Sequence, residues 1–262
     1  MLEIFNSPDA WVALLTLTFL EIVLGIDNII FISIASSKLP EDQQKKATNI
    51  GLLLAMVMRI ILLFGISYLV AMKASFYDID LPWISGGISG QAVILFGGGL
   101  FLLYKSVKEI HEKVEIKEAE ETTQAKSSST LSKAVVQITM INVVFSFDSI
   151  LTAVGMTNGL SEDPNDALLL MIVAVIISVL IMLVFANPVG KFVNKHPSVQ
   201  VLGLSFLILI GFMLLAEAAH LSNLVVFGSH VGVIPKGYLY FTIAFSLMIE
   251  FFNFKLRKKK KL

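Results

Sequence analysis

The sequence predicts an all-α integral membrane protein with seven transmembrane helices, and three observations support this fold class. Hydrophobic residues make up 56% of the chain, charged residues only 15%, and the mean hydropathy is +0.81, which is typical of a membrane protein. Basic residues concentrate in alternate loops, and two apolar stretches carry similar patterns of acids and amides. Seven segments have the roughly 20 mostly apolar residues that a span requires: 10–36, 47–72, 86–106, 133–157, 166–187, 198–220 and 236–254.

Individual segments carry features that bear on their role. Segment 10–36 lacks a preceding basic region and contains Glu21 and Asp27, so it predicts a retained helix and not a cleaved signal peptide. Segment 47–72 contains one charged residue, Arg59, whose simplest role is to neutralise either Glu21 or Asp27. The polar stretch that follows segment 86–106 predicts a helix that continues into water and ends in a flexible serine run.

The distribution of Lys and Arg predicts the orientation. Nearly all of the 20 basic residues lie in the loops 37–46, 105–132 and 188–197 or in the tail that begins at Lys255. The N-terminus and the intervening loops hold very few of them. By the positive-inside rule, the N-terminus is expected outside and the C-terminal tail in the cytoplasm.

The two acid-bearing stretches, Phe19–Phe31 and Ile138–Thr152, predict an internal repeat. When Asp27 is set over Asp148, Glu21 falls on Asn142 and Asn28 falls on Ser149. Three helices per half is an odd number of crossings, so two similar halves would lie upside down relative to each other, as in many secondary transporters. The aligned segments Gly99–Lys105 and Gly211–Glu217 add weaker support.

This repeat divides the chain into four expected parts. Residues 1–108 form the first three-helix repeat and 109–132 a polar cytoplasmic loop. Residues 133–230 form the second repeat, and 231–262 contain the seventh helix and the basic tail. A tail of this composition also has affinity for anionic lipid.

The acids inside the membrane point to a binding site, because an ionised carboxylate at the centre of a membrane helix costs about 2.5–3.5 kcal/mol. The expected ligands all offer oxygen: Glu21, Asp27, Asn28, Asn142, Asp148 and Ser149. Oxygen-only sites favour Ca²⁺, Mg²⁺ or Mn²⁺ over copper or zinc. Asp27 and Glu21 would both face one ion only if the chain unwinds near Gly25. The alternative is that these groups only hydrogen-bond neighbouring helices together.

Other polar residues have possible supporting or gating roles: Arg59, Thr152, Glu217, His220 and Glu250. Glu217 and His220 fit either an outer vestibule or an ordinary pair at the membrane surface. Glu250 lies near the inner boundary, where a charged residue needs no special role. The chain has no cysteine, which excludes disulfides, thiolate metal sites and cysteine nucleophiles.

Several motifs resemble the TerC family of integral membrane proteins: Glu21–Asn28, Phe145–Ser149, Lys108–Glu112, Leu215–Glu217, Ile234–Tyr240 and Phe245–Glu250. The resemblance covers nearly the whole chain and implies a bacterial inner-membrane protein of the LysE-like transporter superfamily. It also implies export of manganese, with Glu21, Asp27, Asn28, Asn142 and Asp148 as the Mn²⁺ site.

The residues and the resemblance together predict a secondary transporter for a divalent cation, with proton exchange as a natural coupling. The expected partners are that cation and the lipid bilayer, with no nucleic acid, no cofactor and no enzymatic activity. Two alternatives remain: an intramembrane aspartyl protease that uses Asp27 and Asp148, and a membrane scaffold of a metal or tellurite stress response. Neither alternative accounts for Glu21 and for the matched motifs.

Overall fold

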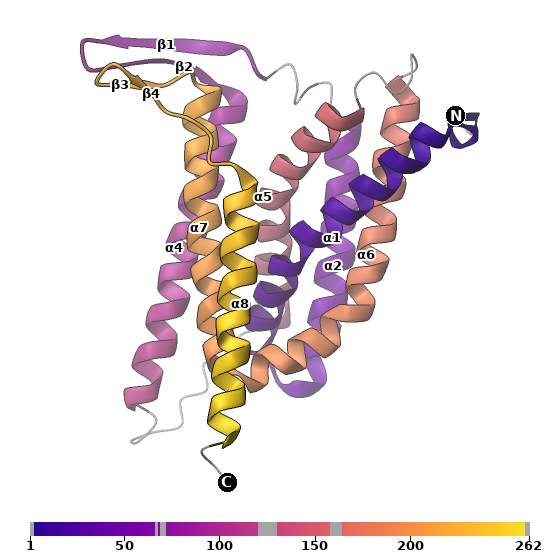
Figure 1. The fold of residues 1–262 in the computed structure, drawn as a ribbon, viewed down its shortest axis with the longest axis vertical. Coiled ribbons are helices and arrows are strands. Elements are labelled where there is room, and N and C mark those ends of the chain that lie inside the picture. Colours follow the sequence, from indigo (N-terminus) through magenta and orange to yellow (C-terminus); the bar gives the residue numbers. More distant parts are fainter. Residues whose placement is uncertain (1–2, 66–67, 69–71, 120–129, 158–163, 260–262) are drawn as a thin grey trace. The chain divides into compact units, whose positions relative to one another are not determined.

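The computed structural model describes residues 3–65, 68, 72–119, 130–157 and 164–259. It is mostly helical, with a small β-sheet (Figure 1). The elements in chain order are η1 (Glu3–Asn6), α1 (Pro8–Ser36), α2 (Glu41–Phe64), β1 (Ser75–Leu81), β2 (Ile84–Ser89), α4 (Gly90–Ala119), α5 (Leu131–Thr157), α6 (Pro164–Lys195), α7 (Pro197–Leu221), β3 (Val225–Val226), β4 (Ser229–His230) and α8 (Lys236–Lys259).

The first of two units comprises Met1–Val70 and Lys126–Lys195, and its main elements are α1, α2, α5 and α6. Helix α1 packs along α6, and α2 packs along α5, with further contacts of α2 to α6 and of α1 to α5. The centre of this unit is filled by apolar side chains that are almost completely buried, among them Phe31, Leu52, Ile138, Ile150 and Leu170. These four helices position the candidate site.

Helix α1 is continuous through Gly25, so the condition under which Asp27 and Glu21 would face one ion, an unwound chain at this glycine, is not met. A Cβ atom at Gly25 would collide with the Sδ atom of Met182 on α6. The glycine therefore serves close packing of two helices, a common role for small residues in membrane proteins. Gly51 serves the same purpose on α2, since a Cβ there would lie 2.5 Å from Ile138 Cγ2 on α5.

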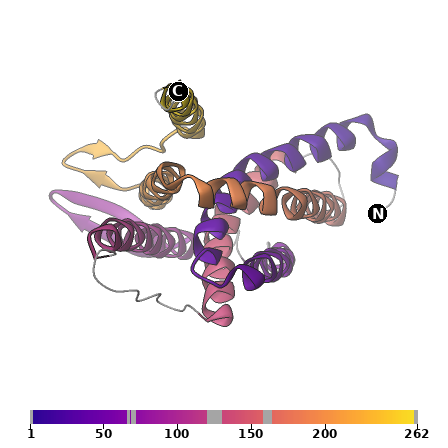
Figure 2. The same ribbon diagram turned by 90° about the horizontal axis from the view of Figure 1, so that it is seen from below.

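The second unit comprises Ala71–Ala125 and His196–Leu262. Within it α4 and α7 lie side by side, as Figure 2 shows from below, and α8 contacts α7. Helices α4 and α7 approach each other closely at Gly99 and Gly211. Each of these glycines removes a side chain at the point where the other helix passes.

The four-stranded sheet of this second unit, in the order β1-β2-β3-β4, was not predicted. Residues 73–85 and 221–235 were expected to be loops, and a helix was expected from residue 86, but Ile84–Ser89 forms β2 and α4 begins at Gly90. Strand β2 pairs with β3, where Ile84 lies opposite Val226. Because these partners are far apart in the sequence, no local pattern indicates the pairing.

The helix boundaries differ from the expected segments in two further places. Helix α6 continues through Pro188 to Lys195, where a loop was expected. Ser33 of α1 donates a hydrogen bond to the Gly190 carbonyl at 3.1 Å, and this contact supports the turn after the proline. Helix α2 begins at Glu41, with Glu41 and Asp42 in its first turn, where acids interact favourably with the helix dipole.

Six helical segments of the described chain are long and apolar enough to cross a membrane: Pro8–Ser36, Glu41–Phe64, Gly90–Glu112, Leu131–Val154, Asn165–Lys195 and Pro197–Leu221. The predicted seventh span is present as helix α8 but is not among them. Its polar residues, Thr242, Ser246, Glu250 and Asn253, lower its hydropathy. A seventh crossing, the inverted repeat and the sides of the termini stay predictions.

Candidate functional site

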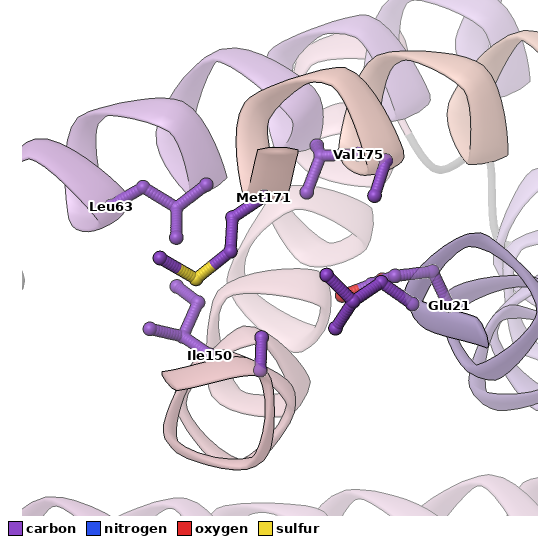
Figure 3. Close-up of a pocket in the computed structure, with 8 residues that line it drawn as sticks. Glu21, Leu63, Ile150, Met171 and Val175 are labelled. Atoms are coloured by element: carbon purple, nitrogen blue, oxygen red, sulfur yellow. The ribbon is translucent and has the colours of Figure 1, made fainter. Parts of the chain in front are cut away.

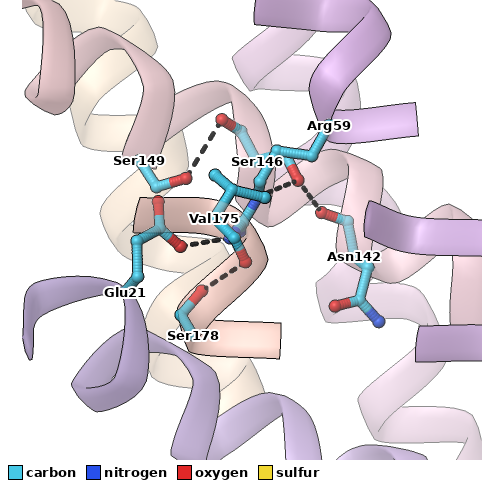
Figure 4. A network of polar contacts seen from close by, with 7 residues as sticks. All are labelled: Glu21, Arg59, Asn142, Ser146, Ser149, Val175 and Ser178. Atoms are coloured by element: carbon cyan, nitrogen blue, oxygen red, sulfur yellow. Dashed lines mark hydrogen bonds and ion pairs between the residues drawn. The ribbon is translucent and has the colours of Figure 1, made fainter. Parts of the chain in front are cut away.

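A buried ion pair lies inside the first unit. Arg59 of α2 donates through its Nη1 atom to Glu21 Oε2 of α1 (Figure 4). Each residue is only 6% exposed. Taking two charges out of water is costly, so each partner stabilises the other in this position. The counter-charge expected for Arg59 is therefore Glu21.

Ser146 of α5 connects the ion pair to a third helix. Arg59 Nε donates to Ser146 Oγ at 3.0 Å, and that hydroxyl donates to the Asn142 carbonyl at 2.6 Å. Ser149 Oγ donates to the Ser146 carbonyl at 3.2 Å, and Asn142 Nδ2 donates to the Ile138 carbonyl at 2.9 Å. Asn142, Ser146 and Ser149 share one helical face because they are spaced by four and three residues.

Two small cavities flank the ion pair. The first is lined by Leu17, Glu21, Leu63, Ile150, Ala153, Met171, Ala174 and Val175 (Figure 3). The second is lined by Leu52, Ala55, Met56, Arg59, Asn142, Ser146, Val179 and Met182. Each measures about 10 Å³, roughly the room that one water molecule needs.

The two cavities lie at different levels along the helices. On α2, Leu63 lines the first and Leu52 the second, so the first lies nearer the C-terminal end of this helix. On α6, which begins at Pro164, Met171 lines the first cavity and Met182 the second. Arg59 and Glu21 are the only charged residues that line either cavity in the described part of the chain.

Of the predicted ligands, Glu21 contacts Arg59 directly, while Asn142 and Ser149 join the same network through Ser146, with the Asn142 side chain directed away from Glu21 (Figure 4). Asn28 lies about two helical turns beyond Glu21 on α1. It is only 2% exposed, and its Oδ1 atom has no hydrogen-bond partner. Asp27 and Asp148 belong to α1 and α5, but their side chains lie outside the described part of the structure. Among the described side chains, no three acidic, histidine or cysteine residues form a cluster suited to a metal ion.

The remaining candidates are less closely placed. Thr152 is half-buried on α5. Glu217 and His220 lie one turn apart in the last part of α7, with Glu217 half-buried and His220 exposed. Glu250 of α8 accepts a 3.3 Å hydrogen bond from Asn253 Nδ2. These last three residues belong to the second unit.

Ser146 was missed as a functional residue, although it anchors the guanidinium. A signal was present in the sequence, because Ser146 shares a helical face with Asn142 and Ser149. The sequence pattern does not show that Arg59 of α2 faces this part of α5, because that contact depends on how the two helices pack.

The comparisons with known proteins agree with a membrane location. The profile described as "Integral membrane protein TerC family" matches residues 6–261. The chain is 45% identical over 257 residues to "UPF0053 inner membrane protein YgdQ" of Escherichia coli (strain K12), and the match covers 98% of both chains. It is 39% identical over 261 residues to "UPF0053 protein" of Haemophilus influenzae, covering 100% of both.

A further relative is longer than this chain. The sequence is 42% identical over 252 residues to "UPF0053 inner membrane protein YoaE" of Escherichia coli (strain K12), which covers 96% of this chain but 44% of that protein. No solved structure matches the chain significantly.

Proposed function

Because this inner-membrane protein belongs to the integral membrane protein TerC family, we propose that it is a secondary transporter that exports a divalent cation, with Mn²⁺ as the cargo. The observation that carries the proposal is the buried carboxylate of Glu21, held by Arg59 between two cavities inside a four-helix unit. A helix-packing role does not require a charge at this depth, since Ser, Thr, Asn and Gln serve that purpose.

The chemistry of the site supports a hard divalent cation. Glu21, Asn142 and Ser149 belong to one polar network through Arg59 and Ser146, in which Glu21 supplies a carboxylate, Ser149 a hydroxyl and Asn142 its main-chain carbonyl. The aspartates Asp27 and Asp148 belong to the same two helices. Oxygen ligands suit Mn²⁺, Mg²⁺ and Ca²⁺. Buried carboxylates also take up protons, which makes exchange of metal against H⁺ our proposed coupling. The choice of Mn²⁺ and of outward transport follows from the family resemblance.

Two packing relationships support an inverted repeat. In the predicted repeat, α1 corresponds to α5, and α2 corresponds to α6. The contact between α1 and α6 then has an equivalent in the contact between α5 and α2. Both contacts occur in the structure. A Cβ at Gly99 would meet Leu215, and a Cβ at Gly211 would meet Leu103. This exchange of equivalent contacts is expected of a two-fold relationship and favours a transporter of the inverted-repeat kind.

The protease alternative explains less of the site. A pair of aspartates that shares a proton and activates water needs no Glu21–Arg59 pair. A scaffold that recruits partners through the 105–132 loop needs no buried charge. Transport accounts for the buried charges, the cavities and the similarity of the two halves together.

Metal flux into proteoliposomes tests the proposal. The purified protein is reconstituted, and uptake of Mn²⁺, Ca²⁺, Mg²⁺ and Zn²⁺ is compared with and without a pH gradient. We expect Mn²⁺ flux that responds to the gradient and is absent from empty liposomes. Equal, background-level flux for all four cations under both conditions would exclude the proposed transport.

A further inference from the structure

We propose that Arg59 is a built-in competitor of the transported cation and closes the path between the two cavities while no cation is bound. This inference rests on the proposed function and adds a specific role for one residue. The guanidinium and the cargo use the same carboxylate, Glu21, so binding of one excludes the other. Arg59 must leave Glu21 before a cation passes.

The first support is position. Glu21 lines the cavity nearer the C-terminal end of α2, whereas Arg59 lines the other cavity with Asn142 and Ser146. The contact between Arg59 Nη1 and Glu21 Oε2 therefore spans the boundary between the cavities. We take this contact as the barrier that a cation meets between the two cavities.

The second support is charge. A guanidinium stays protonated in proteins, so a change of pH does not remove its charge from the path. The pair separates by movement of the side chain or by exchange of one cation for another. In a site shielded from water, two cations near one carboxylate repel each other strongly, and the cargo therefore displaces the guanidinium.

The third support is the anchor on α5. Arg59 Nε donates to Ser146 Oγ at 3.0 Å, while a different nitrogen, Nη1, contacts Glu21. The guanidinium is therefore held from α5 as well as from α1, and Ser146 remains available as a partner when a cation takes Glu21. Ser146 is in this sense a positioning residue, because it holds the displaced guanidinium near the second cavity.

A binding experiment tests the competition. Binding of Mn²⁺ to purified protein is followed by loss of the electron paramagnetic resonance signal of the free ion. Arg59→Gln removes the competitor, so its Mn²⁺ affinity is expected to rise at least about tenfold above wild type. Arg59→Lys keeps a cation and is expected to bind Mn²⁺ much as the wild type does.

The matched control is Lys105→Gln in the second unit. Lys105 Nζ contacts the buried carboxylate of Glu109 at 2.9 Å, so this change also removes a cation beside a buried acid, and neither residue lines either cavity. Its Mn²⁺ affinity should equal that of wild type. Unchanged or weaker Mn²⁺ binding by Arg59→Gln, in a protein whose wild type binds Mn²⁺, overturns the competition. Binding by Arg59→Lys as tight as by Arg59→Gln does so as well.

Thiol accessibility tests the closed path without any metal. The chain has no cysteine, so a single introduced cysteine is the only thiol. Ala153→Cys places it in the first cavity and Ala55→Cys in the second. Oriented vesicles are treated on one side with a small, charged methanethiosulfonate that does not cross lipid.

With Arg59 and Glu21 intact, neither cysteine should react from both sides. In the Glu21→Gln, Arg59→Gln double variant, which removes both charges of the ion pair together, at least one cysteine should react from both sides. One-sided labelling in the double variant overturns the closed-path role. If no protein binds Mn²⁺ or carries a divalent cation, the proposed function fails, and the accessibility result alone decides the role of Arg59.

Discussion

Gly99 and Gly211 meet with their backbones in reciprocal contact. A Cβ atom built at Gly99 would lie 2.8 Å from the Gly211 carbonyl oxygen, and one built at Gly211 would lie 3.0 Å from the Gly99 carbonyl oxygen. Because backbone atoms cannot turn aside as a side chain can, any larger residue at either position must push α4 and α7 apart. These two positions were also aligned with each other by sequence.

We predict that Gly99→Ala and Gly211→Ala each destabilise the protein by about 1–3 kcal/mol, as overpacking does elsewhere. Gly97→Ala is the control, since a Cβ at Gly97 meets nothing within 4 Å. Alanine is the better helix former, so this control should be neutral or slightly stabilising. Unfolding by sodium dodecyl sulfate in mixed micelles, followed by circular dichroism, measures the three variants. Equal losses at all three positions would contradict the close contact.

The ion pair predicts a strongly non-additive pair of substitutions. Arg59→Gln leaves Glu21 buried without a partner, and Glu21→Gln does the same to Arg59, so each should cost about 3–5 kcal/mol of stability. The double variant removes both charges and should recover most of that loss. The same unfolding assay measures it. Additive losses would show that the two residues do not stabilise each other.

The charge of the site predicts a rescue. Glu21→Gln keeps an oxygen but removes a charge, so Mn²⁺ affinity should fall at least about tenfold. Asn142 lies near Arg59 and Ser146, and Asn142→Asp adds a carboxylate there. Combined with Glu21→Gln, it should restore part of the binding, as calorimetry on the single and double variants measures. Strictly additive effects would mean that positions 21 and 142 do not serve one ion.

Asp27 and Asp148 separate transport from proteolysis. Asp27→Asn or Asp148→Asn should abolish Mn²⁺ flux in proteoliposomes while the protein still inserts into the membrane, because each removes a predicted ligand charge. Normal flux in both variants, together with lost cleavage of a membrane substrate, would favour the protease alternative. Immunoblots of membrane fractions control for expression.

The orientation predicts the sides of three segments. A reporter fused after Leu262, or inserted in 127–130, should be cytoplasmic, and one near residue 158 should be external, because basic residues flank the first two positions. Paired alkaline phosphatase and green fluorescent protein fusions measure this. A cytoplasmic reporter near residue 158 would rule out the inverted arrangement.

The sequence alone predicted the features that depend on neighbouring residues, and it missed those that depend on contacts between distant parts of the chain. Hydropathy located the helices, because about 20 apolar residues in succession form a local pattern. The pairing of Arg59 with Glu21 was one of two options in the sequence, since a single membrane cation needs an acid nearby. Ser146 was not assigned to the site, because its contact with Arg59 depends on the packing of α2 against α5.

The small sheet and the continuity of α1 could not be predicted from the sequence, because both depend on contacts with distant residues. Strand β3 has two residues and acquires its structure from pairing with β2, so its own sequence carries almost no information. Gly25 is compatible with a helix break or with close packing, and only Met182 on the neighbouring helix decides between them.

The sheet gives the second unit an asymmetric stiffness. Strand β2 leads directly into α4, while β3 follows α7 after a short turn, and the ladder between Ile84 and Val226 joins these two strands. A further hydrogen bond runs from Gly87 N to the Ser222 carbonyl at 2.7 Å. The start of α4 and the end of α7 are thus joined through the sheet. Any separation between these two helices should therefore be smallest at this end and larger at the other.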